Sequence, residues 1–111
     1  MTGITTHVLD ITSGLPVAGL KVELYDVATT PATRMNSIRT NVDGRTDAPM
    51  LADQDVRQGH FELRFHVGDH FKALNGLSDV VPVRFSIFDA AQRYHFHVLC
   101  APWFFSTYRG S

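Results

Sequence analysis

Apolar and polar residues alternate along much of the chain. From Leu20 to Tyr25, leucine and valine occupy every second position, with lysine, glutamate and tyrosine between them. Successive side chains of a β-strand point to opposite faces, so this period of two predicts a strand with one buried face. The alternation recurs in three other places: Phe61, Leu63, Phe65 and Val67; Val81, Val83, Phe85 and Ile87; and, more weakly, Ile38, Thr40 and Val42.

Turn-forming residues separate these runs. They occur at Ser13-Gly14-Leu15-Pro16, at Asp43-Gly44 and at Gly68-Asp69. Short strands joined by such turns predict an all-β fold, an antiparallel sandwich of two sheets.

One segment has the signals of a short helix. It runs from about His70 to Asn75, where Asp69 could cap the first turn and Gly76 could end the last. The stretch from Val27 to Asn36 is rich in Thr, Ala and Pro and is expected to be a long loop.

Length and composition limit the possible functions. The chain has 111 residues, 44% of them hydrophobic, which suits one domain over residues 1–111 with one core. A formal net charge of -1 gives no basic field, so nucleic acid is not an expected partner. The first residues carry neither a basic flank nor a long apolar stretch, so neither a signal peptide nor a membrane partner is expected. The single cysteine, Cys100, lies in an apolar run and is expected to be a buried, inert thiol of a cytoplasmic protein.

Six histidines are candidates for chemistry near neutral pH. His60, His66 and His70 lie near strand ends or on polar strand faces and are expected to be solvated structural residues. His95 and His97 differ, because period two places both on one face of a strand. The opposite face of that strand carries Tyr94, Phe96 and Val98.

A metal ion is one explanation for the paired histidines. Imidazoles two positions apart on a strand lie about 7 Å apart at the backbone and can bind one ion. A metal site needs further ligands, and no HxxxH motif, CxxC motif or tight carboxylate cluster accompanies the pair. The residues favour a site without metal, and chelation by His95 and His97 is the alternative.

Two further residues are ambiguous on sequence alone. His7 lies in a strand-like segment, where a surface histidine is the simpler interpretation. Arg45 leaves the tight turn Asp43-Gly44, where an arginine is usually solvated but is also well placed to hold a carbonyl-rich ligand. No Gly-x-Ser-x-Gly elbow, Walker loop or dinucleotide-binding glycine pattern is present, so any hydrolysis must use water.

The end of the chain, Tyr108-Arg109-Gly110-Ser111, resembles the signature that closes 5-hydroxyisourate hydrolases and separates them from the hormone carrier transthyretin, which has the same fold. The similarity covers nearly the whole chain. The other matching segments, in order, are Thr6–Asp10, Gly14–Gly19, Thr40–Arg45, Phe61–Leu63 with Gly68, and Tyr94–His95 with Ser106–Tyr108.

The resemblance assigns site residues by position. The catalytic positions of the family fall on His7, Arg45, His95 and Ser111. Thr107 and Tyr108 fall on positions that shape the pocket, so substrate binding is expected to involve them together with His7 and Arg45. The family's fold implies a transthyretin-like sandwich with one short helix. Its assembly implies a homotetramer, a dimer of dimers with the site in a channel at the dimer-dimer interface, and no metal or organic cofactor.

The chain departs from the family pattern around the expected pocket. Arg93 stands where the family usually has histidine, and His97 where it usually has proline. Trp103-Phe104-Phe105 replaces a segment that usually resembles Tyr-x-Tyr. These departures bear on substrate preference and rate more than on the fold, and they leave His95 as the family residue of the histidine pair.

The implied reaction is hydrolysis of 5-hydroxyisourate, in which water attacks an acyl carbon of the six-membered ring. His95 is the favoured base and His7 the group that orients water or protonates the leaving nitrogen, although the reverse assignment stays open. Arg45 would stabilise the oxyanion, and Ser111 would complete the hydrogen bonds around His95. The alternatives are a non-catalytic carrier like transthyretin and a hydrolase of a related cyclic ureide.

Overall fold

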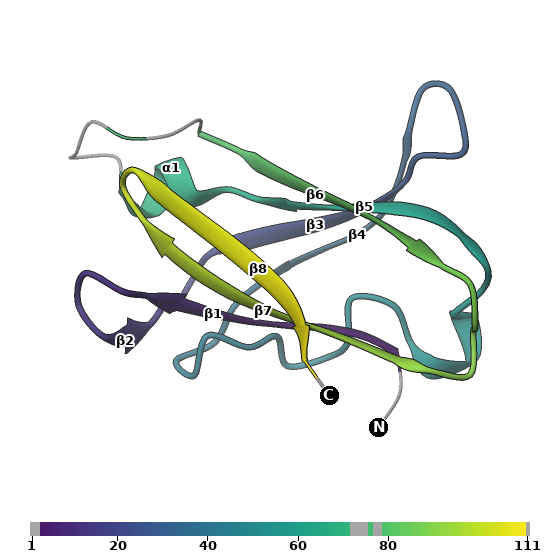
Figure 1. The fold of residues 1–111 in the computed structure, drawn as a ribbon, viewed down its shortest axis with the longest axis horizontal. Coiled ribbons are helices and arrows are strands. Elements are labelled where there is room, and N and C mark those ends of the chain that lie inside the picture. Colours follow the sequence, from purple (N-terminus) through teal and green to yellow (C-terminus); the bar gives the residue numbers. More distant parts are fainter. Residues whose placement is uncertain (1–2, 72–75, 77–78, 111) are drawn as a thin grey trace.

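Two four-stranded sheets face each other across one core (Figure 1). The computed structural model describes residues 3–71, 76 and 79–110. The first sheet has the order β2-β1-β7-β8, and the second has the order β4-β3-β5-β6. The strands are β1 (Gly3–Asp10), β2 (Leu15–Pro16), β3 (Lys21–Asp26), β4 (Thr33–Arg39), β5 (Gly59–Phe65), β6 (Val81–Ile87), β7 (Arg93–Ala101) and β8 (Phe104–Gly110).

The strands run antiparallel to their neighbours except for β1 and β7, which pair in parallel. This pair brings the beginning of the chain beside its end: Gly3 lies opposite Arg93, and Gly110 lies opposite His95. The two ends of the described chain are close together for this reason (Figure 1).

The structure buries the strand faces that the alternation of apolar and polar residues predicted. Leu24, Phe61, Leu63 and their alternating neighbours face the core, as expected for strands with one buried face. The weak pattern at residues 38–42 was a poorer guide. Strand β4 ends at Arg39, and the side chain of Val42 is 80% exposed because it belongs to the turn that follows.

Two local predictions were wrong in position. The helix α1 covers Val67–His70, earlier than expected, and residues 72–75 of the predicted helix lie outside the described residues. Asp69 lies inside the first turn instead of capping it, and His66 occupies the cap position, where its side chain makes no hydrogen bond to the helix backbone. The expected loop from Val27 to Asn36 is shorter than predicted, because β4 begins at Thr33 and pairs with β3.

A single-turn 3-10 helix, η1 (Asp53–Asp55), completes the described elements. Among the residues that the structure describes, no helix is long and apolar enough to cross a membrane.

Candidate active site

The outer face of the sheet β2-β1-β7-β8, turned away from the core, carries a transverse row of functional side chains. His7 of β1 lies opposite His97 of β7, and His97 lies opposite Tyr108 of β8. On the other side of β1, His7 forms an isolated antiparallel bridge with Arg45. Partners in register point to the same side of a sheet, so Arg45, His7, His97 and Tyr108 form one row on four neighbouring segments.

A second row lies two positions along the strands. Thr5 of β1 is opposite His95 of β7, which is opposite Gly110 of β8. His95 is almost completely buried, with 4% of its surface exposed, and its Nδ1 is hydrogen-bonded to the Thr5 hydroxyl at 2.6 Å. Both histidines of β7 therefore point away from Tyr94, Phe96 and Val98, as the sequence predicted.

The turn at residues 41–45 presents Arg45 to this face. The Asn41 side chain accepts hydrogen bonds from the backbone N–H groups of Asp43 and Arg45, at 2.9 and 3.3 Å. Gly44 has a positive φ of 75°, and a Cβ there would collide with the carbonyl oxygen of Val8. The same close approach lets Val8 N–H donate to the Gly44 carbonyl at 2.9 Å. Only glycine fits this position without strain, and it anchors the next residue, Arg45, beside β1.

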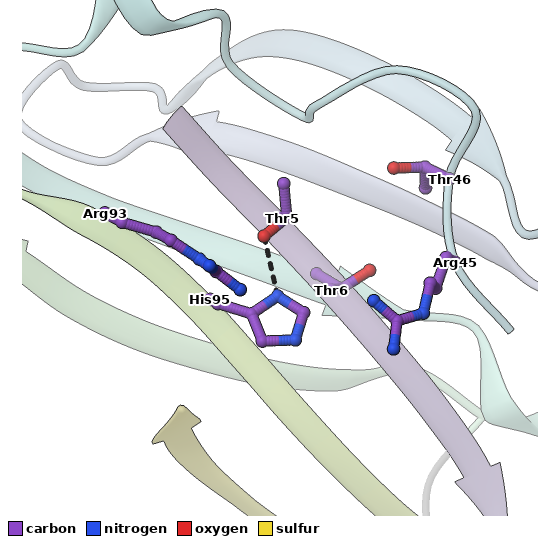
Figure 2. A pocket seen from close by; sticks show the side chains of 6 residues that line it. All are labelled: Thr5, Thr6, Arg45, Thr46, Arg93 and His95. Carbon is purple, nitrogen blue, oxygen red and sulfur yellow. Dashed lines mark hydrogen bonds between the residues drawn. The ribbon is translucent and has the colours of Figure 1, made fainter. Parts of the chain in front are cut away.

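A pocket of about 210 Å³ opens beside Thr5 and His95 of the second row and Arg45 of the first (Figure 2). Its basic side chains come from two separate parts of the chain: Arg45 from the turn, and Arg93 and His95 from β7. Hydroxyl groups supply the rest of its polar lining. The complete lining is Thr5, Thr6, Arg45, Thr46, Arg93 and His95.

The surroundings of His95 and His7 favour the neutral form of each ring. Burial is the main cause, reinforced by the neighbouring His97 and Arg93, and it lowers the pKa of His95 from 6.5 to about 4. Burial also lowers the pKa of His7, with further contributions from Arg45 and His97. At neutral pH both rings therefore have a lone pair that can accept a proton.

His97 connects the two rows. Its ring lies edge-on to His95, with 4.6 Å between centroids, and stacks on Tyr108 at 4.9 Å. Its ring centroid is 5.9 Å from that of His7. Three imidazoles thus share this face. In the described part of the chain, however, no three His, Cys, Asp or Glu side chains are placed to hold one metal ion. The metal-free site stays a prediction.

The end of the chain lies against the histidine rings. A Cβ on Gly110 would lie 2.5 Å from the His97 ring and 3.2 Å from the His95 ring, so the glycine lets the backbone approach both. Ser111, the next residue and a predicted catalytic group, lies outside the described residues.

The two predicted pocket-shaping residues lie on opposite faces of β8. Tyr108 faces the histidines and is 56% exposed. The Thr107 hydroxyl donates to the His97 carbonyl at 2.9 Å, so Thr107 supports the backbone of β7. Their assignment to substrate binding stays a prediction.

Comparison with known proteins identifies the family of this chain. A family model described as HIUase/Transthyretin family matches residues 4–110. The chain belongs to the HIUase/Transthyretin family. The resemblance inferred from the terminal signature and the predicted sandwich fold are thereby confirmed.

Relatives and solved structures of the family show two kinds of protein. A 5-hydroxyisourate hydrolase of Deinococcus radiodurans is 44% identical over 98% of this chain and 96% of its own length. The structure of Klebsiella pneumoniae 5-hydroxyisourate hydrolase superposes with a TM-score of 0.83, at 27% identity and full coverage of both chains. Sea bream transthyretin, solved in complex with thyroxine, gives a TM-score of 0.87 at 16% identity, over 96% of this chain and 93% of that one. Fold similarity alone therefore does not separate an enzyme from a carrier in this family.

The resemblance assigned Arg45, His7 and His95 to the site of this family member but did not predict which other residues line its pocket. Arg45, His7 and His95 do lie together, but Thr5, Thr6 and Thr46 were missed as lining residues. Hydroxyl residues are common on strands, and nothing in their spacing marks them. Arg93 was noted only as a departure from the family pattern; its alternation with His95 and His97 was the available signal, since all three share one strand face.

The other histidines have structural partners. The His66 and His70 side chains pair with the buried carboxylates of Glu23 and Asp10, at 2.5 and 2.9 Å, and His60 contacts Ser86 at 2.7 Å. They are structural, as expected, but the first two are less solvated than predicted. Cys100 is buried, and burial raises the pKa of its thiol to about 11, which agrees with the inert thiol that was predicted.

Proposed function

We propose that the chain hydrolyses 5-hydroxyisourate to 2-oxo-4-hydroxy-4-carboxy-5-ureidoimidazoline, a step of urate breakdown. The observation that carries the proposal is the convergence of Arg45 and His95 on one pocket, with His7 beside Arg45 in the same row. These groups are supplied by three distant segments of the chain, and together they suit water activation next to an anion-stabilising charge. The relatives named 5-hydroxyisourate hydrolase support the substrate.

The proposed mechanism assigns one task to each group. The unprotonated nitrogen of His95 removes a proton from water, whose oxygen forms a bond to the acyl carbon of the ring. The Arg45 guanidinium stabilises the oxyanion as it develops. The C–N bond then breaks, and the leaving nitrogen receives a proton from a histidine, either His95 or His7. Ser111 would complete the hydrogen bonds around His95, next to Gly110.

We further propose that the site works in a homotetramer, a dimer of dimers. Several large apolar side chains are exposed at the end of the same sheet that carries the β1–β2 and β7–β8 turns: Ile11, Leu15, Trp103 and Phe104. Burying them against a second copy would also cover the histidine face and exclude water from it.

Mass measurement at micromolar concentration should give four chains; a monomer alone would contradict the shared site. The free, buried Cys100 favours a reducing compartment, and we propose the cytoplasm.

Two other functions compete with this proposal. A carrier like transthyretin would bind a small ligand without turnover, and a diverged hydrolase would act on a related cyclic ureide. The charged and titratable lining at Arg45, Arg93 and His95 favours chemistry over carriage, because an apolar ligand gains nothing from burying such groups.

The decisive experiment mixes the purified protein with freshly generated 5-hydroxyisourate and follows its ultraviolet absorbance. We expect decay far faster than the uncatalysed reaction and strongly reduced in a His95→Ala variant. Decay at the uncatalysed rate would contradict the hydrolase. A related cyclic ureide turned over instead would identify the diverged enzyme, and stoichiometric binding without turnover would identify the carrier.

A further inference from the structure

Thr5 holds the ring of His95 through one of its two nitrogens, Nδ1. The two residues are 90 positions apart in sequence and become neighbours because β1 and β7 pair in parallel. The distance between the Thr5 hydroxyl oxygen and His95 Nδ1 is 2.6 Å, short for a hydrogen bond between a hydroxyl and a ring nitrogen. Figure 2 shows this bond, with the second ring nitrogen of His95 on the side of the ring away from Thr5.

This contact bears on which nitrogen of His95 carries its proton. A neutral imidazole has one N–H donor and one lone pair, and the partner of one nitrogen sets the state of the other. If Nδ1 donates to the Thr5 oxygen, then Nε2 has the lone pair and can accept a proton. If Nδ1 accepts from Thr5, then Nε2 carries the proton and cannot act as a base.

We infer that Thr5 is a positioning residue whose hydroxyl oxygen accepts a hydrogen bond from His95 Nδ1–H, so that Nε2 is the lone-pair nitrogen. The inference rests on the proposed function and assigns the base of that reaction to one atom. Nε2 takes the proton of the attacking water, and Nδ1–H stays bonded to Thr5 in the imidazolium that forms. Nε2–H can then return its proton to the leaving nitrogen, which restores the starting state.

The chemistry of the surroundings agrees with a neutral partner for this histidine. A carboxylate at Nδ1 would favour a charged imidazolium, whereas a hydroxyl orients the ring without adding charge. Near His95 the charged side chains that line the pocket are the two arginines, Arg45 and Arg93, which disfavour a resting imidazolium. A hydroxyl partner therefore keeps the base uncharged until it takes a proton from water.

The chain offers a matched control on the opposite sheet. There, His60 Nδ1 and the Ser86 hydroxyl are also hydrogen-bonded, at 2.7 Å, between β5 and β6. Ser86→Ala removes the same kind of bond from a histidine outside the proposed site. It should leave turnover unchanged, and the unmodified His60 supplies a second histidine with a hydroxyl partner for spectroscopy.

The test compares Thr5→Val, Thr5→Ser and Ser86→Ala with the unmodified protein. Valine has the shape of threonine without the hydroxyl, and we expect it to lower kcat by about tenfold or more, with KM nearly unchanged, because the base loses its orientation. Serine restores the oxygen and should recover most of the loss. Thermal unfolding of each variant checks that the fold is kept.

The tautomer is read without substrate, from long-range ¹⁵N–¹H correlations of the histidine rings. We expect His95 to be protonated at Nδ1 in the unmodified and Thr5→Ser proteins, and to shift toward protonation at Nε2 in Thr5→Val. A His95 protonated at Nε2 in the unmodified protein would overturn the inference, as would an unchanged tautomer in a slowed Thr5→Val protein. Because this measurement needs no turnover, an inactive unmodified protein would contradict the proposed function while the tautomer still decides the role of Thr5.

Discussion

The outer faces of the two sheets differ in whether their charged side chains have partners of opposite charge. On the sheet β4-β3-β5-β6, the buried carboxylate of Glu62 accepts hydrogen bonds from Arg64 and Arg84 at 2.6 and 2.8 Å, and that of Glu23 pairs with Arg34 and His66. Burial opposes ionisation, but the hydrogen bonds from Arg84 and Arg64 hold the pKa of Glu62 below its usual value. Buried charges on this face have partners within the fold.

The face of β2-β1-β7-β8 has no such arrangement among the described residues. Its pocket gathers two guanidinium groups and a histidine, and none of the six lining residues is a carboxylate. Burial is the main cause that lowers the pKa values of His7 and His95, and the positive charges nearby lower them further instead of being neutralised. In one fold, then, paired charges accompany stability, and charges that converge without an opposite partner indicate a place for a ligand.

The largest expected effect is that of His95→Ala, which distinguishes a residue that acts in turnover from one that acts in stability. His95→Ala removes the proposed base and should lower turnover by about two to four orders of magnitude, the usual contribution of general acid-base catalysis. The matched variant Glu62→Gln on the other face should leave turnover unchanged and lower the free energy of unfolding by about 1 to 3 kcal/mol, because two arginines lose a charged acceptor. Kinetics and urea unfolding measure both. Equal losses of activity in the two variants would abolish the distinction between the faces.

Arg45→Ala should be the next largest effect. Loss of one oxyanion-stabilising group typically costs about two orders of magnitude in turnover. Arg84→Ala is the control, since the Arg84 side chain is 72% exposed and its guanidinium pairs with Glu62 on the other sheet. Turnover of Arg84→Ala should match the unmodified protein. Unmodified kinetics from Arg45→Ala would remove Arg45 from the site.

The sequence predicted the local features of the site better than the contacts between distant strands. Period two places His95 and His97 on the same strand face, and the turn at Gly44 marks Arg45, because both signals are local. The bond between Thr5 and His95 depends on the register of two strands 90 residues apart, which alternation does not determine. The pairing of Glu23 with His66 has the same origin, since its partners lie 43 residues apart.

The helix and the first part of β4 were misplaced for a related reason. Capping and turn residues occur both at Asp69 and in the stretch from Val27 to Asn36, but tertiary pairing decides where an element begins. Strand β4 starts at Thr33 because it pairs with Asp26 at the end of β3, through an irregularity between Leu24 and Tyr25. A local pattern contains no information about that irregularity.

The two faces should also lose stability in different pH ranges. His95 has a folded pKa of about 4 against its usual 6.5, so the unfolded chain binds more protons between these values. Its contribution to stability is therefore complete above pH 6.5 and is lost as the pH falls toward 4. The folded pKa of Glu62 is lowered from 4.5, so its contribution is complete above 4.5 and is lost at more acidic pH. Urea unfolding at a series of pH values measures both ranges.

Two variants test whether each pH range of stability loss comes from the residue, and so from the sheet face, to which it is attributed. His95→Phe should flatten the decline between pH 6.5 and 4, and Glu62→Gln should flatten the decline below pH 4.5. If both variants changed the same range, the two faces would not differ in the way described.

The smallest expected effect concerns His97, which lies in the middle of the row without being assigned to proton transfer. Its ring stacks on Tyr108, lies edge-on to His95 and lies against Gly110. His97→Ala should therefore lower turnover only several-fold, whereas a metal held by His95 and His97 would make either substitution abolish function.

The same variant removes one cause of the lowered pKa of His95 and of His7, so the acidic limb of kcat/KM should move to higher pH. His60→Ala is the control and should change neither quantity. A His97→Ala protein as inactive as His95→Ala, together with stoichiometric metal and inactivation by a chelator, would replace the proton-transfer site with a metal centre.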